Sequence, residues 1–579
     1  MRQEERTEMR KRLTRTLLIL ALGATLIGSR PAAGAENPEN TRRPADASSP
    51  SATEAKTGAA TPQDELAILK KQVVQQQAQI DQLLRSIQQL NERLDAPNRA
   101  RLPEPVTTGD GGQIASLVPL IPATPPSVPA QPASTPATTL RETEKSVSDA
   151  PLQLHIGSAY ITPVGFMDFT SVWRSHDGGS GIGTNFASIP YGNVFQNNLS
   201  EFRLSMQNSR IGFRVDALVK GAHVIGYMES DFLGNNPGNV AVSSNSNTMR
   251  SRVYWVDVRK GPWEVLGGQT WSLITPGRTG ISPLPGDLFY TQNIDVNYQL
   301  GLFWGRIPEF RFVYHPSNKV AFAVALDNPE QYVGGSAGGS LITFPSALSS
   351  AYSSELNTGG TTLGVPNVAP DVIAKLAVDP SKKFHFEVGG VERNFKLWNP
   401  VTMNNYSAAG GGGFLNLNFE LFKGFRVLTN NFWSDGGGRY IFGQAPDLIA
   451  KVDGSPSLIH ADSTVSGIEY THKNTLIYSY YGGLYVGRNF TIDTSGKPVG
   501  YGYTGSSAGQ NKSVQEATFG FAETFWKDAK YGALTLMGQY SYVTRNPWAV
   551  ATGQPKDTHL NMVFLNLRYT LPGSAPAMK

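Results

Sequence analysis

The sequence predicts an all-β protein, a 16-stranded antiparallel transmembrane β-barrel preceded by an N-terminal periplasmic coiled-coil helix and a Pro-rich linker. Three observations support this prediction: short segments of alternating polarity, short turns that alternate with long loops, and an export signal at the N-terminus. The chain has 579 residues, a formal charge of +4 and no cysteine, which excludes disulfide scaffolds and thiolate metal sites. Its 60 glycines and 27 phenylalanines suit a sheet with many turns and aromatic rims.

Residues 1–35 have the three regions of a cleavable export signal. Basic residues precede an apolar run from Leu17 to Ile27, and Ala33-Gly34-Ala35 supplies the small residues that a signal peptidase needs. The run is shorter than the roughly 20 residues of a permanent spanning helix, so we predict cleavage after Ala35. Residues 36–62 are rich in Ala, Pro, Ser and Thr without periodicity, which predicts a disordered spacer.

A seven-residue repeat over residues 63–96 predicts a coiled coil. Apolar residues recur every seven positions, and a second series three residues later holds Leu69, Leu83 and Leu90 with the polar Gln76 among them. A single amphipathic helix on a globular surface is the alternative, but the opposite faces are fully polar, so a lone helix would have nothing to bury. Residues 97–150 are dense in Pro, Ala and Thr, which predicts an extended linker before a β domain at residues 151–579.

Sixteen segments of the β domain alternate apolar and polar residues with the period of two that strands require. In "FLNLNFEL" (414–421), Leu and Phe side chains share one face of the strand, and Asn and Glu share the other. The segments lie near residues 161–174, 199–219, 222–233, 250–260, 263–271, 308–315, 319–328, 370–379, 383–398, 411–422, 424–434, 462–472, 475–489, 512–526, 531–545 and 558–570.

Short turns and long connections alternate between these segments. Lys220-Gly221 and Lys423-Gly424 are short turns, whereas the connections near 272–307 and 399–410 are predicted as long loops. This rhythm is typical of an outer-membrane β-barrel, whose short turns face the periplasm. Both ends of the β domain lie on the short-turn side, which places the predicted coil in the periplasm.

The distribution of polarity distinguishes a membrane barrel from a soluble sandwich, whose apolar faces meet in a core and whose loops are short at both ends. Here the apolar faces carry aromatic residues near their ends, as at Phe310 and Tyr314, and the opposite faces carry residues such as Glu309. We therefore expect the apolar faces to meet lipid and the polar faces to line a watery lumen. The sheet must close, because lipid cannot satisfy an open edge.

One segment, residues 199–219, changes the parity of its apolar positions. Phe202 and Leu204 are even-numbered, whereas Ile211 and Phe213 are odd-numbered. A β-bulge near residues 207–209 would switch the parity. The alternative is that two strands meet there, which would change the strand count by one.

Four stretches resemble the DcaP-like family of trimeric outer-membrane porins, in this order and spacing: "MESDFLG" (228–234), "RSRVYWVDV" (250–258), "LGGQTWSL" (266–273) and "VAFAVALDNPE" (320–330). That family also pairs a periplasmic coiled coil with a 16-stranded barrel. The resemblance implies a homotrimer that passes small, often anionic solutes such as dicarboxylates. The end of the chain, "TLPGSAPAMK", departs from the terminal aromatic residue common in such barrels.

By position, the third long connection corresponds to the loop that often folds into the lumen of general porins and narrows it. A surplus of guanidinium groups along such a passage favours anions through charge-assisted bidentate contacts. For each arginine the alternative is a lumen salt bridge that only braces the wall. The candidate pore residues, from this loop and from predicted inward faces, are Arg203, Arg259, Arg278, Arg306, Arg311, Asp287 and Asp295.

Enzymatic activity is not expected, because the eight histidines are scattered and none has a metal-ligand spacing. No cofactor is expected either. Nucleic acid is not an expected partner, since basic residues do not cluster with aromatic ones. The sequence is interpreted as a passive diffusion channel of the bacterial outer membrane for small hydrophilic solutes, with a preference for anions or dicarboxylates.

Two alternatives remain open. In the first, the barrel is a closed anchor, and the coil tethers it to the cell wall by reaching peptidoglycan. In the second, the channel is selective for sugars, and Trp255, Trp271 and Trp304 form a ladder on which pyranose rings stack.

Overall fold

The computed structural model describes residues 154–236, 246–288, 291–335, 341–358, 365–507, 509–548 and 552–572. The predicted signal peptide, spacer, coiled coil and linker lie outside the described residues. No helix within the described ranges is long and apolar enough to span a membrane.

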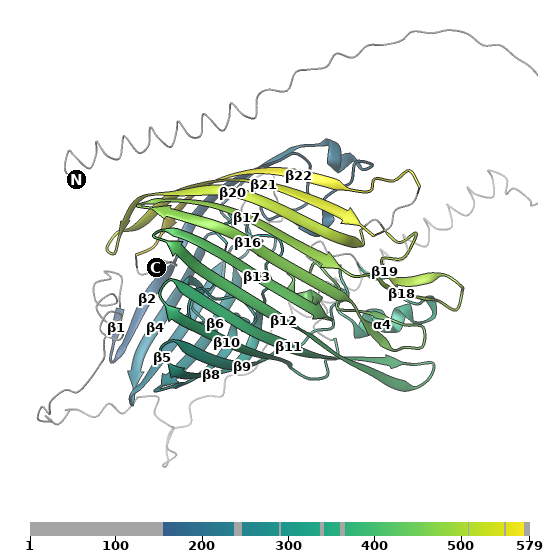
Figure 1. Cartoon of the computed structure of the whole chain (residues 1–579), viewed down its shortest axis with the longest axis horizontal. Helices are drawn as coiled ribbons and strands as arrows, with labels where there is room; N and C mark the ends of the chain where they lie inside the picture. The colour runs from purple at the N-terminus through teal and green to yellow at the C-terminus, as the bar shows by residue number, and fades with distance from the viewer. Residues whose placement is uncertain are drawn as a thin grey trace, which may run out of the picture. The chain divides into compact units, whose positions relative to one another are not determined.

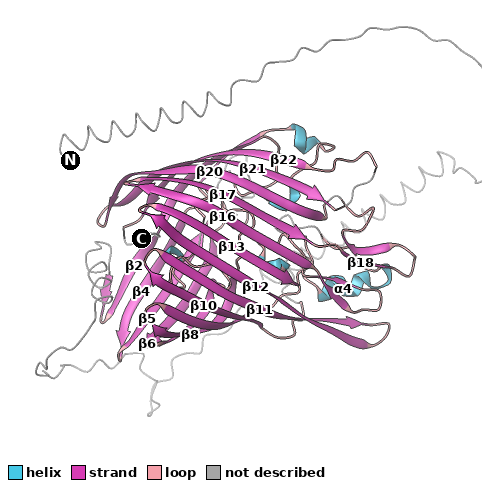
Figure 2. Ribbon diagram, viewed as in Figure 1, coloured by secondary structure: helices cyan, strands magenta, loops and turns pink. Residues whose placement is uncertain are grey.

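The described residues form one closed antiparallel sheet of sixteen barrel strands, as the sequence predicts (Figures 1 and 2). Each strand pairs with the next along the chain, and β2 pairs with β22 from Phe166↔Thr570 to Arg174↔Met562, which closes the barrel. The strands are β2 (Ala159–Arg174), an interrupted strand made of β3 (Glu201–Ser205) and β4 (Arg210–Val219), β5 (Ala222–Asp231), β6 (Arg250–Lys260), β7 (Trp263–Trp271), β8 (Arg306–Ser317), β9 (Val320–Asp327), β10 (Asp371–Ser381), β11 (Phe384–Asn399), β12 (Asn404–Phe422), β13 (Phe425–Asp435), β16 (His460–His472), β17 (Thr475–Val486), β20 (Asn511–Asp528), β21 (Gly532–Pro547) and β22 (Thr558–Thr570).

The remaining elements are short. A strand before the barrel pairs with the start of β2, and the others lie in the long connections. They are β1 (Leu154–Ile156), η1 (Phe186–Ser188), η2 (Phe195–Asn198), η3 (Pro285–Asp287), η4 (Ser346–Leu348), α4 (Ser349–Glu355), η5 (Gly438–Tyr440), the hairpin of β14 (Leu448–Ala450) and β15 (Pro456–Leu458), and the hairpin of β18 (Asn489–Ile492) and β19 (Pro498–Tyr501).

The parity change in the second barrel strand is a local irregularity, as the sequence predicts. Residues 206–209 separate β3 from β4, and both pair with the same strand, β2. Phe202 on one side of the interruption and Ile211 on the other are both exposed on the outside of the barrel. The interruption therefore switches parity while both halves keep their apolar side chains outward.

Short turns occupy one end of the barrel, called the turn end below, and the long connections occupy the other, called the loop end. Lys220 and Gly221 join β4 to β5 with positive φ angles of 50° and 75°. Two-residue hairpin turns need this left-handed backbone to match the strand twist. The predicted rhythm of turns and loops is thus present in the structure.

The connection predicted as a long loop near 399–410 is instead a tight hairpin. β11 and β12 stay paired as far as Asn399↔Asn404, so that only residues 400–403 remain as the turn. Both strands extend past their neighbours at the loop end (Figure 1). The sequence signal fails here because Ala and Gly fill residues 408–413 and leave no alternation to recognise.

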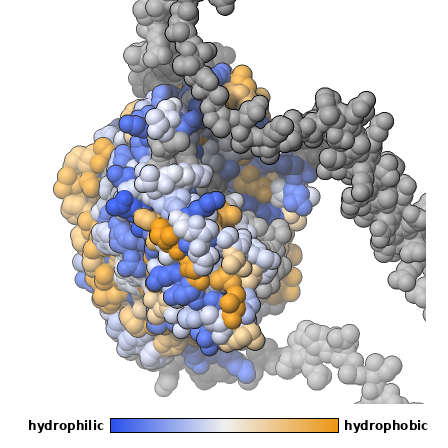
Figure 3. Space-filling model, turned by 90° about the vertical axis from the view of Figure 1, so that its right-hand side faces the viewer, coloured by the Kyte–Doolittle hydropathy of each residue, from blue (hydrophilic) through white to orange (hydrophobic). Residues whose placement is uncertain are grey.

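The outward and inward faces of the strands differ in polarity as expected for a membrane barrel. On β8, Phe310 and Phe312 are exposed on the outside, whereas Glu309 and Arg311 point inward and are buried. In Figure 3 the side wall of the barrel, at the left edge, is mostly hydrophobic, and the loop end that faces the viewer is mostly hydrophilic. An exposed apolar surface of this extent requires a partner other than water.

One buried arginine joins two long connections to the barrel wall at the loop end. Arg393 of β11 pairs with Asp371 at 3.0 Å and with Asp447 at 2.8 Å. It also donates a hydrogen bond to the carbonyl oxygen of Glu330 at 2.6 Å. The connections after β9 and β13 are therefore fixed to the same point of the wall.

Candidate functional site

The connection between β7 and β8, residues 272–305 and called L3 below, lies inside the barrel. Its Phe303 stacks on Phe432 with ring centroids 5.3 Å apart and also contacts Phe414 at 5.8 Å. At Gly301, where φ is 87°, an added Cβ would meet the Thr464 carbonyl oxygen at 2.3 Å. L3 therefore packs directly against the inner wall, as the sequence predicts.

Inward polar side chains of the wall satisfy the backbone of L3. The Gly277 N–H donates to Glu387 Oε2 at 3.0 Å, and the Leu300 N–H donates to Glu516 Oε2 at 2.8 Å. The Ile294 N–H donates to Gln539 Oε1 at 2.7 Å. These bonds replace water for backbone groups that a buried loop would otherwise leave unpaired, and they span β11, β20 and β21.

A group of charged side chains, called the arginine cluster, lies where L3 meets the wall formed by β4, β5, β6 and β8. Arg250 binds Asp231 through two nitrogens at 3.1 and 2.9 Å. Arg252 binds Glu229 at 2.9 Å and Asp231 at 2.5 Å, and Arg210 binds Glu229 at 3.3 Å. The cluster consists of Arg210, Arg250, Arg252, Arg306, Glu229, Asp231 and Tyr298.

Arg306 is the member of this cluster without a counter-charge. Its guanidinium lies 5.4 Å from the ring centroid of Trp271 and 5.5 Å from that of Trp304. In the described part of the chain it forms no ion pair and no hydrogen bond, and the residue is half-buried. Three guanidinium groups pair with two carboxylates and Arg306 is a fourth, so the cluster carries a positive excess.

Tyr298 of L3 is in contact with this excess charge. Its hydroxyl accepts a hydrogen bond from Arg252 at 3.0 Å. Burial by itself would raise the pKa of the phenol, but the charges of Arg252, Arg210 and Arg306 lower the pKa to about 8. The residue also has a φ of 66°, which is uncommon outside glycine. The site thus holds a tyrosine in a strained backbone where the local potential is positive.

The structure places the three other candidate residues of L3 at separate points. Arg278 forms a bidentate pair with Glu469 of β16 at 3.0 and 2.7 Å. Asp287 accepts a hydrogen bond from the Ser282 hydroxyl at 2.8 Å. Asp295 accepts one from the Thr184 N–H at 3.2 Å, which ties L3 to the first long connection. Burial raises the pKa of Asp287 and Asp295 above the ordinary range.

The candidate residues of the wall are also dispersed. Arg203 is exposed at the loop end and pairs with Glu201 at 2.7 Å. Arg259 is exposed near the turn end of β6. Arg311 is buried, pairs with Glu309 at 2.5 Å and donates to the Trp271 carbonyl oxygen at 2.8 Å. Among the seven candidates, the arginine cluster therefore contains Arg306 alone.

Sequence reasoning missed Arg210, Arg250, Arg252 and Tyr298 as site residues. A signal existed for two of them, because Arg250 and Arg252 share strand parity and follow Glu229 and Asp231 on the preceding strand. Recognising the cluster required the register between β5 and β6, which shifts near Glu229. Arg210 follows the interruption in the second strand, where the parity is not readable from local pattern.

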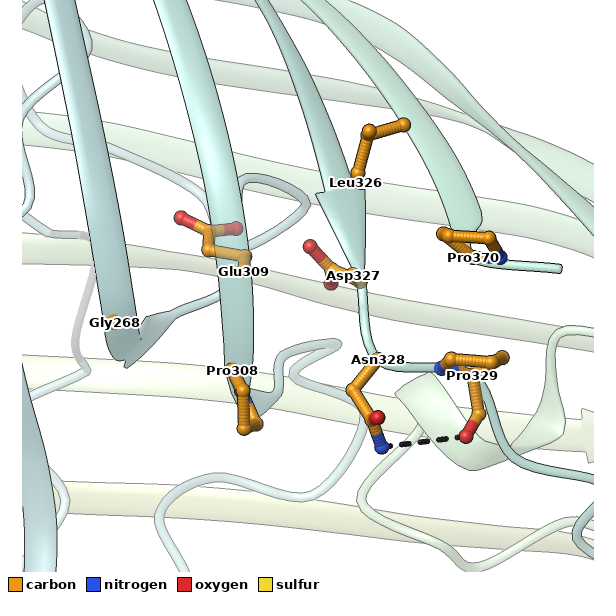
Figure 4. Close-up of a pocket in the computed structure, with 8 residues that line it drawn as sticks. All are labelled: Gly268, Pro308, Glu309, Leu326, Asp327, Asn328, Pro329 and Pro370. Carbon is orange, nitrogen blue, oxygen red and sulfur yellow. Dashed lines mark hydrogen bonds between the residues drawn. The ribbon is translucent and has the colours of Figure 1, made fainter.

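A cavity of about 340 Å³ lies at the loop end of β8 and β9, and the carboxyl groups of Glu309 and Asp327 line it. Asp327 accepts a hydrogen bond from the Ser272 hydroxyl at 2.5 Å. Figure 4 shows the Asn328 side chain donating to the Pro329 carbonyl oxygen, at 3.4 Å. Two carboxylates and mostly apolar neighbours do not suit an anion. The cavity is lined by Gly268, Pro308, Glu309, Leu326, Asp327, Asn328, Pro329 and Pro370.

The three tryptophans of the predicted sugar ladder are buried. Trp255, Trp271 and Trp304 are 3, 1 and 8% exposed. Trp255 stacks on Tyr227, and Trp304 stacks on Phe442. Their ring faces are therefore occupied by protein groups, and the structure offers no aromatic ladder at these positions.

Comparison with known proteins supports the same fold. The sequence matches no family model and no curated protein. The outer membrane channel DcaP of Acinetobacter baumannii is similar in structure, with a TM-score of 0.52, 16% identity, and coverage of 72% of this chain and 98% of that chain. This chain has the fold of an outer-membrane porin. The predicted resemblance to the DcaP-like porins is confirmed at the level of the fold.

Two further porin structures are also similar. An anion-selective porin from Comamonas acidovorans has a TM-score of 0.40 and 12% identity, with coverage of 71% of this chain and 99% of the porin. OprB of Pseudomonas putida has a TM-score of 0.38 and 12% identity, with coverage of 70% of this chain and 94% of OprB.

Proposed function

We propose that this porin-fold protein is a passive diffusion channel of the outer membrane for small hydrophilic solutes, with a preference for anions that includes dicarboxylates. The observation that carries the proposal is Arg306, a half-buried guanidinium inside the barrel without a counter-charge. A carboxylate could take up its free N–H donors in a bidentate contact. Arg250, whose side chain is 40% exposed, offers a second cation to the other end of a dicarboxylate.

Two of the paired arginines add to this preference because water reaches them more readily than it reaches their carboxylates. Arg568 is 26% exposed and its partner Asp168 is 0% exposed. Arg250 and Asp231 show the same inequality, at 40 and 0%. At these two points a solute meets a guanidinium group before it meets a carboxylate, which favours anions even though the charges balance.

The proposal retains the partners that the sequence implies. Outer-membrane lipid would cover the outward apolar side chains, and three copies would form a homotrimer, with the coil in the periplasm and peptidoglycan within its reach. A closed anchor, the competing interpretation, predicts the same lipid contact but no ion flow. Conductance therefore separates the two functions.

The test is a recording of the purified full-length protein in planar bilayers under a KCl gradient. We expect discrete conductance steps and a reversal potential of the sign that chloride permeation produces, because Arg306, Arg250 and Arg568 present accessible positive charge. Insertion without conductance would favour the closed anchor. A reversal potential of the cation-selective sign would contradict the anion preference.

A further inference from the structure

A rigid aromatic platform lies on the outside of the barrel, at the loop end of β17, β20 and β21. The Trp548 indole N–H donates to the Val486 carbonyl oxygen at 2.7 Å, and its backbone N–H donates to the Gln510 carbonyl oxygen at 3.1 Å. Gly502, with a φ of 76°, lies against the ring, and an added Cβ there would meet Trp548 Cδ1 at 2.8 Å. The indole is thus held in one position by three separate segments.

Two cations flank this indole without a carboxylate partner in the described ranges. The Arg488 guanidinium lies 5.6 Å from the ring centroid, and the Lys512 ammonium lies 5.2 Å from it. Both residues are exposed. A cation–π contact orients a cation but leaves its charge uncompensated. The platform therefore presents two positive charges beside one fixed ring, which is complementary to a compact anion of more than one charge.

The height of the platform on the barrel identifies the source of such an anion. Tyr485, which contacts Trp548 edge-on at 5.9 Å, is exposed on the outside at the loop end of β17, and Tyr481, Tyr542 and Phe519 are exposed nearer the middle of the same three strands. Aromatic side chains at the ends of membrane strands, such as those of Tyr485 and Trp548, mark the boundary between acyl chains and headgroups, whereas outward side chains nearer mid-strand meet acyl chains. Provided that the barrel is embedded as the proposed function requires, Arg488 and Lys512 lie at headgroup level in the outer leaflet.

We propose that Arg488, Lys512 and Trp548 bind a phosphate monoester of a phosphorylated glycolipid in the outer leaflet, whose acyl chains extend along the outward aromatic side chains below. A phosphate monoester carries a charge of about −1.5 to −2 near pH 7, which matches two cations. The diester of a common phospholipid carries a single negative charge and matches them less well. The sugar ring of a glycolipid also presents a flat C–H face that can contact the uncovered part of the half-buried indole.

The experiment titrates the full-length protein in detergent micelles with bis-phosphorylated lipid A and measures the bound fraction by native mass spectrometry. Arg488→Ala combined with Lys512→Ala should weaken binding roughly tenfold, since each cation near an anionic lipid surface contributes attraction. The exchange Arg488→Lys with Lys512→Arg keeps both charges and should retain binding. Lys530→Ala is the matched control, because Lys530 lies 5.5 Å from the ring centroid of Tyr531 at the turn end of the same hairpin.

Three further ligands distinguish the sources of phosphate: lipid A without its phosphates, phosphatidylglycerol, and inorganic phosphate. We expect each to bind the wild-type protein no better than it binds the double alanine variant. Equal affinity of lipid A for the wild type and the double variant would overturn the proposal. Phosphatidylglycerol that binds as tightly as lipid A would overturn the glycolipid assignment.

Conductance recordings on the same samples test the proposed channel function independently of the lipid site. Arg488 and Lys512 lie outside the lumen, so the double variant should conduct as the wild type does, which also shows that it is folded. A wild type that conducts but shows no preference for lipid A contradicts the lipid site alone. A wild type that binds lipid A through these residues but never conducts contradicts the channel alone.

Discussion

Replacing Arg306 with alanine is expected to remove most of the proposed anion preference of the channel. The guanidinium has no counter-charge in the described part of the chain, so the change removes a full positive charge from the solute path. At an effective dielectric constant of about 20, one charge about 8 Å away contributes about 2 kcal/mol. After screening by salt, we expect the ratio of chloride to potassium permeability to fall about tenfold. Reversal potentials under a KCl gradient measure this ratio.

Arg203→Ala is the matched control for this variant. It removes the same charge, but Arg203 is paired with Glu201 at 2.7 Å and lies exposed at the loop end, where solvent screens it. We expect its permeability ratio to stay close to that of the wild type. Equal shifts in the two variants would mean that selectivity follows net charge and does not depend on the arginine cluster.

Shortening L3 is expected to widen the passage. Gly277 and Leu288 already face each other in an antiparallel bridge, so an Asn-Gly turn can replace residues 278–287 without moving either one. The change deletes Arg278, which ends its ion pair with Glu469. It also empties the part of the lumen, towards the turn end, that residues 278–287 fill. We expect the single-channel conductance to increase about twofold or more, because the narrowest section limits ion flow.

The same replacement in the β11–β12 hairpin is the control for the effect of shortening a connection. Asn399 and Asn404 are paired, so an Asn-Gly turn can also replace residues 400–403. This hairpin extends beyond the neighbouring strands at the loop end (Figure 1), and its shortening should leave the conductance unchanged. If L3 shortening also leaves the conductance unchanged, residues 278–287 do not limit the passage.

The strands could be predicted from the sequence because lipid on one side and water or polar loop on the other impose a strict alternation. β8 shows this most clearly, since Phe310 and Phe312 alternate with Glu309 and Arg311. The alternation of polarity cannot be recognised where side chains are absent, as in the glycine run of β12. For this reason the extended β11–β12 hairpin was not predicted. Alternation reports the two faces of a strand, and a residue without a side chain belongs to neither.

The charged site was less predictable because function depends on what each charge meets across the barrel. Arg306 and Arg311 look alike in the sequence, yet Arg311 is buried against Glu309 and Arg306 is left without a carboxylate. That difference is set by strand register and by the path of L3. The local sequence pattern contains neither the strand register nor the path of L3. It could therefore identify arginines that point inward, but not that Arg306 is the one without a carboxylate partner.

The central claim, that polar faces line a watery lumen and apolar faces meet lipid, is tested most directly by cysteine accessibility at two adjacent residues of β4. The chain has no native cysteine, so Arg214→Cys and Phe213→Cys each introduce a single thiol, one facing inward and one outward. A charged, membrane-impermeant thiol reagent reacts with thiolates that water reaches. We predict that it labels the membrane-embedded Arg214→Cys variant and reduces its current, and leaves Phe213→Cys unlabelled until detergent is added. Labelling of Phe213→Cys in the intact membrane with protection of Arg214→Cys would contradict the account.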